Sequence, residues 1–144
     1  MKVAVCSEGG WRLTPLCIKT FYAKRGIDCY CYKREKAGEK SYKYTADTYN
    51  KNLYYYSEDF GDEVDWDTII RCNTKLADIN LDWRYNQAFI STLMELGDAA
   101  YADGTTIRLV DIPDGAEYEV EEGRTWDDEK NEYYYEEIYI KTYL

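Results

Sequence analysis

Histidine is absent from all 144 residues of the chain. Its imidazole is the commonest general base near neutral pH and the commonest metal ligand among side chains. The absence excludes imidazole-based catalysis and the usual histidine-containing zinc sites. We therefore expect no catalytic residues, no metal and no cofactor, and the composition favours a binding protein over an enzyme.

Proline and glycine are also scarce, with two and nine residues, so the chain has no long flexible linker and 144 residues predict one domain, residues 1–144. No stretch approaches the roughly 20 apolar residues of a membrane-spanning helix. The apolar run at residues 1–5 is too short for an export signal. Five cysteines, an odd number, are typical of a reducing compartment. These features predict a cytoplasmic protein with no membrane partner.

Acidic residues outnumber basic residues in the chain. There are 18 lysines and arginines and 28 acidic residues, so the net charge is −10. A protein-wide basic footprint for nucleic acid is therefore excluded. A small anionic ligand is not excluded, since a local pocket with a few arginines can oppose the global field. The dense carboxylate runs after residue 116 are typical of a solvated face, or of a surface that imitates the charge of a nucleic acid.

Two helices are well marked. The first spans residues 15–25, with Thr14 as its cap, Pro15 at the first position and Gly26 just past the end. Its expected apolar positions include Leu16. The second begins after Asn86 and ends at Gly97, with an apolar stripe that includes Met94. Residues 67–75 remain ambiguous between a short helix and a turn.

Strands account for most of the remaining pattern. We expect them at residues 2–6, 27–33, 42–45, 52–56, 105–112, 117–121 and 133–143. The last two form a hairpin joined by a polar loop at residues 123–131. Strands cluster and alternate poorly with helices, so the predicted fold class is α+β, a mostly antiparallel sheet wrapping two helices.

Tyrosine is unusually common, with 17 residues, and lies mainly in these strands. Most of the strand tyrosines are expected to be structural, because tyrosine is a good strand former. A few could line a pocket and stack on a base. The spacing Cys29-x-Cys31 is too tight for the usual zinc site and predicts strand alternation.

Ligand contacts are expected where arginine, aromatic and turn residues gather. Gly10 and Trp11 follow the first strand, where backbone amides can face an anion, although a simple turn explains the glycine equally well. The segment Trp83-Arg84-Tyr85-Asn86 precedes the second helix, and guanidinium forks suit phosphate while indole stacks on bases. Alternatively, Asn86 only caps the helix and Arg84 pairs with a carboxylate.

A charge within an apolar strand also needs a partner. Alternation places Arg108 with Val110 and Ile112 on one face of its strand, so either a phosphate or an internal carboxylate is expected beside it. Arg71, next to Ile69 and Ile70, raises the same question.

Several short motifs, in order along most of the chain, resemble a family of small bacteriophage and prophage proteins. They are Gly9-Gly10 after the first strand, Leu13 and Thr14, the segment from Tyr54 to Asp67, Arg84-x-Asn86, Glu95-Leu96-Gly97, and the run from Val110 to Tyr118. The family includes or lies near the first-described type of Thoeris anti-defence sponge. The resemblance implies binding of a cyclic ADP-ribose isomer without cleavage, and homodimers or larger homo-oligomers.

The leading hypothesis is therefore a phage-encoded sponge for a cyclic nucleotide immune signal in an infected bacterial host. Arg84, Arg108 and Arg71 would bind phosphate, while Asn86 or Asp111 would bind ribose hydroxyls. Trp83, Tyr85 or Trp11 would stack on the base. Two alternatives belong to other classes: an acidic nucleic-acid mimic that inhibits a host defence protein, and a carboxylate-dependent enzyme that degrades the signal.

Overall fold

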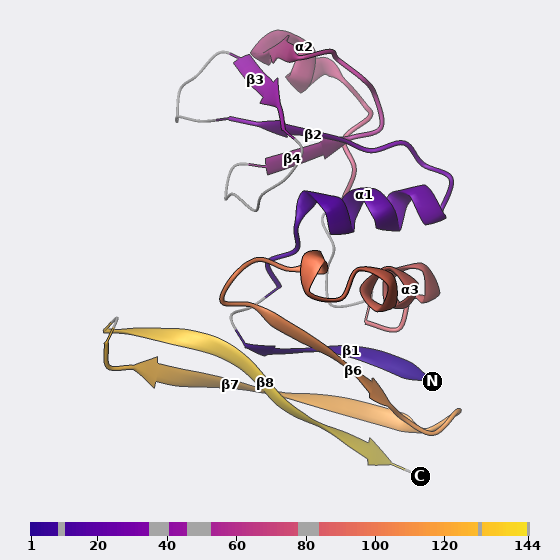
Figure 1. The fold of residues 1–144 in the computed structure, drawn as a ribbon, viewed down its shortest axis with the longest axis vertical. Coiled ribbons are helices and arrows are strands. Elements are labelled where there is room, and N and C mark those ends of the chain that lie inside the picture. Colours follow the sequence, from indigo (N-terminus) through magenta and orange to yellow (C-terminus); the bar gives the residue numbers. More distant parts are fainter. Residues whose placement is uncertain (9–10, 35–40, 46–52, 78–83, 130, 144) are drawn as a thin grey trace. The chain divides into compact units, whose positions relative to one another are not determined.

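The computed structural model describes residues 1–8, 11–34, 41–45, 53–77, 84–129 and 131–143. Helices and antiparallel strands combine in an α+β fold, as predicted (Figure 1). The strands are distributed over three sheets, with orders β1-β6, β4-β2-β3-β5 and β7-β8. The chain divides into two compact units, which we call the split unit (Met1–Leu13 with Asn80–Leu144) and the inserted unit (Thr14–Ile79). One domain for the whole chain stays a prediction.

The split unit is built around its first strand. Its elements are β1 (Lys2–Glu8), α3 (Gln87–Leu96), the 3₁₀ turn η2 (Gly97–Ala100), β6 (Thr106–Asp111), β7 (Glu117–Asp127) and β8 (Glu132–Tyr143). β1 pairs antiparallel with β6 and also contacts α3 and β8 (Figure 1). Because it has neighbours on several sides, residues 3–6 of β1 are completely buried and form the centre of this core.

Local signals set the ends of α3. The Asn86 side-chain oxygen accepts from the backbone amides of Ala88 (3.0 Å) and Phe89 (3.3 Å), as a cap should. Gly97 ends the helix with a φ of 55°, in the left-handed region that glycine adopts most easily. Phe89, Ile90 and Leu93 are buried. Met94 is 61% exposed, so its assignment to the apolar stripe was wrong.

The β7–β8 hairpin is longer than the sequence pattern indicates. We expected a polar loop at residues 123–131, but pairing continues from Glu117 opposite Tyr143 to Asp127 opposite Glu132. Strand-forming residue types occupy paired register positions there, such as Trp126 opposite Tyr133, which favours continued pairing. The turn then falls between the two strands, where Asn131 has a φ of 54°.

The inserted unit holds one sheet and two helices. Its elements are α1 (Pro15–Lys24), β2 (Tyr30–Lys33), β3 (Ser41–Tyr44), β4 (Leu53–Tyr56), β5 (Glu63–Asp65) and α2 (Trp66–Arg71). Strand pairing places Tyr54, Tyr32 and Tyr44 side by side across the sheet. Tyr32 and Tyr54 pack with Ile69 of α2 in one apolar cluster, whereas Tyr44 is exposed. The strand tyrosines are thus largely structural, as expected.

α1 follows its predicted signals closely. Thr14 Oγ accepts from the Cys17 amide at 3.3 Å, Pro15 begins the helix, and Gly26 has a φ of 75°. The core face is rotated from the expected one. Cys17 is completely buried, whereas Leu16 is 46% exposed, which corrects the prediction for Leu16.

No helix in the described ranges is both long enough and apolar enough to span a membrane.

Candidate functional site

The structure brings three of the predicted ligand residues together in the split unit, at the start of α3. The guanidinium carbon of Arg84 lies 5.2 Å from the centre of the Trp11 ring. Trp11 is half-buried and also contacts Phe89 of α3, with ring centres 6.2 Å apart. Tyr85, directly after Arg84, is 51% exposed. We call Trp11, Arg84 and Tyr85 the arginine–aromatic cluster.

Arg84 is fixed by the backbone of β1. Its guanidinium Nη1 donates to the carbonyl of Ala4 at 3.1 Å, and the Ala4 amide donates to the carbonyl of Arg84 at 2.9 Å. Only 6% of Arg84 is exposed. A buried guanidinium needs hydrogen-bond acceptors, and here a backbone carbonyl supplies one. The structure therefore gives Arg84 a clear structural role in holding β1, whatever else it binds.

Tyr118 of β7 lies within electrostatic range of this cluster. Burial raises the pKa of its phenol, the neighbouring Tyr85 raises it further, and the positive charge of Arg84 acts in the opposite direction. Tyr118 thus lies near Tyr85 and near Arg84, whose guanidinium contacts the half-buried Trp11. This combination of ring faces and positive charge is suited to a base and a phosphate.

Asn86 caps α3, which is the structural alternative to ligand binding at this position. Its side-chain oxygen is already bonded to two amides at the start of α3. The side-chain amide group can still donate to a ligand, because the cap uses only the oxygen.

Arg108 and Asp111, two of the predicted ligand residues, both lie on β6. Arg108 is exposed, so the expectation that it is a charge on a buried apolar face was wrong. Ile112, which the expected alternation places on the same face, is buried, and its amide donates to the carbonyl of Met1 at 2.8 Å, which continues the register of β1 with β6.

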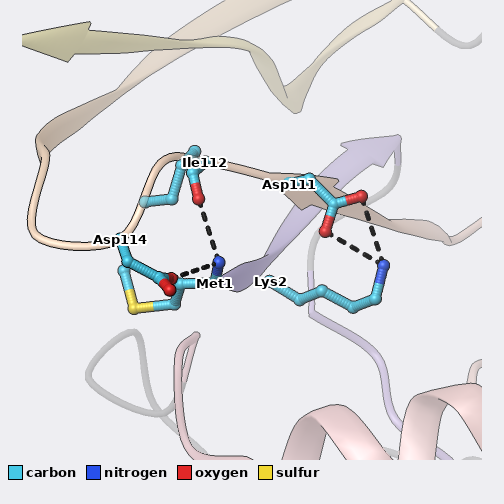
Figure 2. Close-up of polar contacts among 5 residues, drawn as sticks. All are labelled: Met1, Lys2, Asp111, Ile112 and Asp114. Atoms are coloured by element: carbon cyan, nitrogen blue, oxygen red, sulfur yellow. Dashed lines mark hydrogen bonds and ion pairs between the residues drawn. The ribbon is translucent and has the colours of Figure 1, made fainter.

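Asp111 forms an ion pair with the first residue of β1. Lys2 Nζ lies 3.1 and 3.3 Å from its two carboxylate oxygens (Figure 2). Beside this pair, the amino group of Met1 donates to the carbonyl of Ile112 at 2.9 Å and to the carboxylate of Asp114 at 2.8 Å. The ammonium lowers the pKa of Asp114. These contacts fasten the ends of β1 and β6 together, so the structure gives Asp111 a structural partner.

Arg71 is the last residue of α2 in the inserted unit and is exposed. Thr68 donates to the Asp65 carboxylate and lowers its pKa, and the positive charge of Arg71 adds to this effect. Gly10 and Trp83 lie outside the described residues, so ligand contact by these two residues stays a prediction.

Sequence reasoning missed a hollow in the inserted unit. It has a volume of about 270 Å³ and is lined by Tyr30, Tyr44, Asp59, Gly61 and Asp62. None of the predicted ligand residues that the structure describes lines it. The only sequence signal was the alternation of tyrosines at 30, 32, 42 and 44, followed by the acidic segment after Tyr56.

A second set of unpredicted contacts runs along the same sheet. The guanidinium of Arg34 lies 5.1 Å from the centre of the Trp66 ring, and Trp66 contacts Tyr42, whose ring is 6.0 Å away. Tyr42 in turn contacts Tyr54 at 5.3 Å. These rings stabilise the sheet, because tilted aromatic pairs add to the free energy of apolar burial. Among the described residues, no group of three or more acidic or cysteine side chains is arranged to hold a metal ion.

Comparisons with known proteins give no relative for this arrangement. No family model matches the chain, and searches of curated proteins and of solved structures also found no match.

Proposed function

We propose that the protein binds a phosphorylated nucleotide of the cyclic ADP-ribose class and sequesters it without cleaving it, as a phage anti-defence sponge. The proposal takes the ligand class, the infected bacterial cytoplasm and a homo-oligomeric state from the motif resemblance. The single structural observation in its favour is the arginine–aromatic cluster, in which a buried guanidinium lies against a half-buried indole ring beside an exposed phenol.

Each part of the cluster has a distinct use. Tyr85 offers an exposed ring on which adenine can stack, and Arg84, the preceding residue, offers positive charge. Asn86 retains an amide donor for a ribose hydroxyl. Sequestration requires no proton transfer, so a chain without histidine can perform it.

The test is isothermal titration calorimetry with a panel of cyclic ADP-ribose isomers and cyclic di- and trinucleotides. We expect at least one to bind with micromolar or tighter affinity. Tyr85→Ala should weaken that binding by about 1–3 kcal/mol, or about five- to 150-fold, since base–aromatic stacking has this magnitude. Met94→Ala, a change at another exposed side chain of the same region, is the matched control and should bind like the wild type.

Recovery of the ligand separates sequestration from degradation. After denaturation of the complex, the nucleotide should be recovered intact by liquid chromatography. A cleaved product would support the enzyme alternative, and no binding across the whole panel would exclude the proposed function.

A second candidate, an acidic inhibitor of a host nucleic-acid-binding protein, is favoured by the segment that leads into α2. Its carboxylates are all exposed, namely Glu58, Asp59, Asp62, Glu63, Asp65 and Asp67. A pull-down from bacterial lysate tests it. A stoichiometric partner that is lost at high salt, and that the Glu63→Gln/Asp67→Asn variant captures less well, would favour this function over the first.

A further inference from the structure

The hollow in the inserted unit combines aromatic rings with carboxylates. Tyr30 is half-buried and Tyr44 is 43% exposed, so both rings reach the surface of the hollow. Asp59 and Asp62 supply two negative charges at its rim, and both are exposed. Rings with an accessible face and nearby carboxylates are the groups that recognise organic cations.

Hydrogen bonds to the hydroxyl of Tyr32 hold the loop that carries the two carboxylates. Tyr32, completely buried, donates from its hydroxyl to the carbonyl of Gly61 at 3.0 Å and accepts from the Phe60 amide at 2.8 Å. Asp59 Oδ1 accepts from the Gly61 amide at 2.8 Å. Burial raises the pKa of Tyr32, and the nearby charge of Asp59 contributes to the increase. The hollow is therefore a preorganised feature of the sheet.

The chain itself shows that one of these rings attracts an ammonium group. Lys19 of α1 places its Nζ 4.8 Å from the centre of the Tyr44 ring and donates to the Tyr44 hydroxyl at 3.1 Å. The same ring that lines the hollow thus already contacts one alkylammonium, supplied from within the chain.

We infer that this hollow is a binding site for an alkylammonium group, with Tyr30 and Tyr44 contacting the cation through their rings and Asp59 and Asp62 through their carboxylates. The site is independent of the nucleotide site proposed above, because none of its residues belongs to the arginine–aromatic cluster. A free polyamine and a lysine side chain present the same group, so the chemistry is common to both sources.

The charge balance favours a cation over a phosphate. Among the described residues, two carboxylates line the hollow and no lysine or arginine does, so this lining repels a phosphate. Lys19 competes for the Tyr44 ring, so removing its ammonium should increase affinity for an added amine. A phosphate site would respond in the opposite direction, because it would lose the positive charge beside Tyr44.

The experiment follows the Gly61 amide in two-dimensional ¹H–¹⁵N NMR spectra during titration with butylammonium chloride, spermidine and the methylamide of acetyl-lysine. We expect a saturable shift with a Kd of about 1 mM or below at low ionic strength, weakened by added salt. If only spermidine and butylammonium bind, the natural source is a free amine. Binding of the lysine derivative as well extends the source to lysine side chains.

The decisive variant is Asp59→Asn/Asp62→Asn. An asparagine oxygen can still accept from the Gly61 amide, so the loop keeps its turn while the charge is lost. We expect about tenfold weaker binding in this variant. The matched control, Glu63→Gln/Asp67→Asn, removes two charges from the same segment outside the hollow and should bind within about twofold of the wild type.

The Lys19→Ala variant is the second test, and it should bind the added amines about threefold more tightly than the wild type. The inference is overturned if none of the three amines gives a saturable shift at Gly61. It is also overturned if the two double variants lose affinity equally, or if Lys19→Ala binds amines more weakly and inorganic phosphate shifts Gly61 in the wild type.

Discussion

Arg84 and Ala4 exchange two hydrogen bonds, one in each direction, so that Arg84 acts on β1 as a short additional strand would. Ala4 is also paired with Leu109 of β6. In an antiparallel pair, alternate residues direct their backbone groups toward the outer edge, and these groups need partners when they are buried. Arg84 provides them for Ala4.

Replacement of Arg84 by methionine should therefore destabilise the split unit. The variant keeps an unbranched apolar stem but leaves the buried Ala4 carbonyl without its donor, which costs about 1–3 kcal/mol. Urea unfolding followed by circular dichroism measures the loss. Met94→Ala, at an exposed position of α3, is the control and should change the free energy of unfolding by less than about 0.5 kcal/mol. Equal effects in the two variants would contradict the assigned role of Arg84.

Loss of the α3 cap should be measurable on its own. Asn86→Ala removes the acceptor for two backbone amides and should lower the free energy of unfolding by about 1 kcal/mol. Asn86→Asp keeps an oxygen in the same place and should retain most of the stability, because a negative charge is also favourable at a helix start. Gln87→Ala, at the exposed next residue, should have little effect. An alanine at residue 86 that leaves the unfolding midpoint unchanged would argue against this cap.

Tyr32→Phe should affect both the stability and the hollow of the inserted unit. Removal of one hydroxyl takes a donor from the Gly61 carbonyl and an acceptor from the Phe60 amide, at a cost of about 1–3 kcal/mol. With its loop loosened, the variant should also bind alkylammonium more weakly in the Gly61 titration. Tyr85→Phe, which removes a hydroxyl from an exposed ring, is the matched control for stability.

Stability should fall at alkaline pH because α1 contains a buried thiol. Burial raises the pKa of Cys17 from 9.0 to about 12, so the folded thiol stays protonated in a range where the unfolded thiol ionises. Unfolding then releases a proton. The stabilisation is complete below about pH 9 and is lost between about pH 9 and 12, at up to about 1.4 kcal/mol per pH unit for this group.

Urea unfolding at a series of pH values measures this slope. Cys17→Ala should reduce it by the contribution of one group. A slope should remain, because burial also raises the pKa of Cys29 to about 12 and that of Cys31 to about 11. Leu16→Ala, an exposed and non-ionisable neighbour, should keep the wild-type slope. A Cys17 variant with an unchanged slope would mean that this thiol ionises equally in the folded and unfolded states.

The elements that the sequence predicts well are those whose ends carry local chemical signals. Thr14 with Pro15 and Asn86 with Gly97 define both long helices, because capping and left-handed turns act within a few residues. The sequence pattern did not predict β5, and it left the region of α2 ambiguous between a short helix and a turn. Glu63–Asp65 is only three residues long, and it becomes a strand by pairing with β3, about 20 residues earlier in the chain.

The site was less predictable because it depends on contacts between distant segments. The residues around Arg84 suggested a ligand, but only the structure shows that the guanidinium bonds to Ala4, 80 residues away. The burial of Arg108 was predicted wrongly because strand alternation does not state which face is buried. The neighbours of β1 and β6 decide which face that is. The hollow was missed because β2, β3 and the loop before β5 form it together.

Trp11 and Trp66 each contact an arginine side chain, and each can report optically on its own unit. Trp11 contacts Arg84 in the split unit, whereas Trp66 contacts Arg34 in the inserted unit. Indole fluorescence responds to the loss of such a neighbour, so a protein in which Trp11 or Trp66 is the one tryptophan kept out of four would follow the melting of one unit alone. Coincident melting curves from two such proteins would mean that the units unfold together, and separate curves would mean that a ligand of one unit can protect it while the other unfolds.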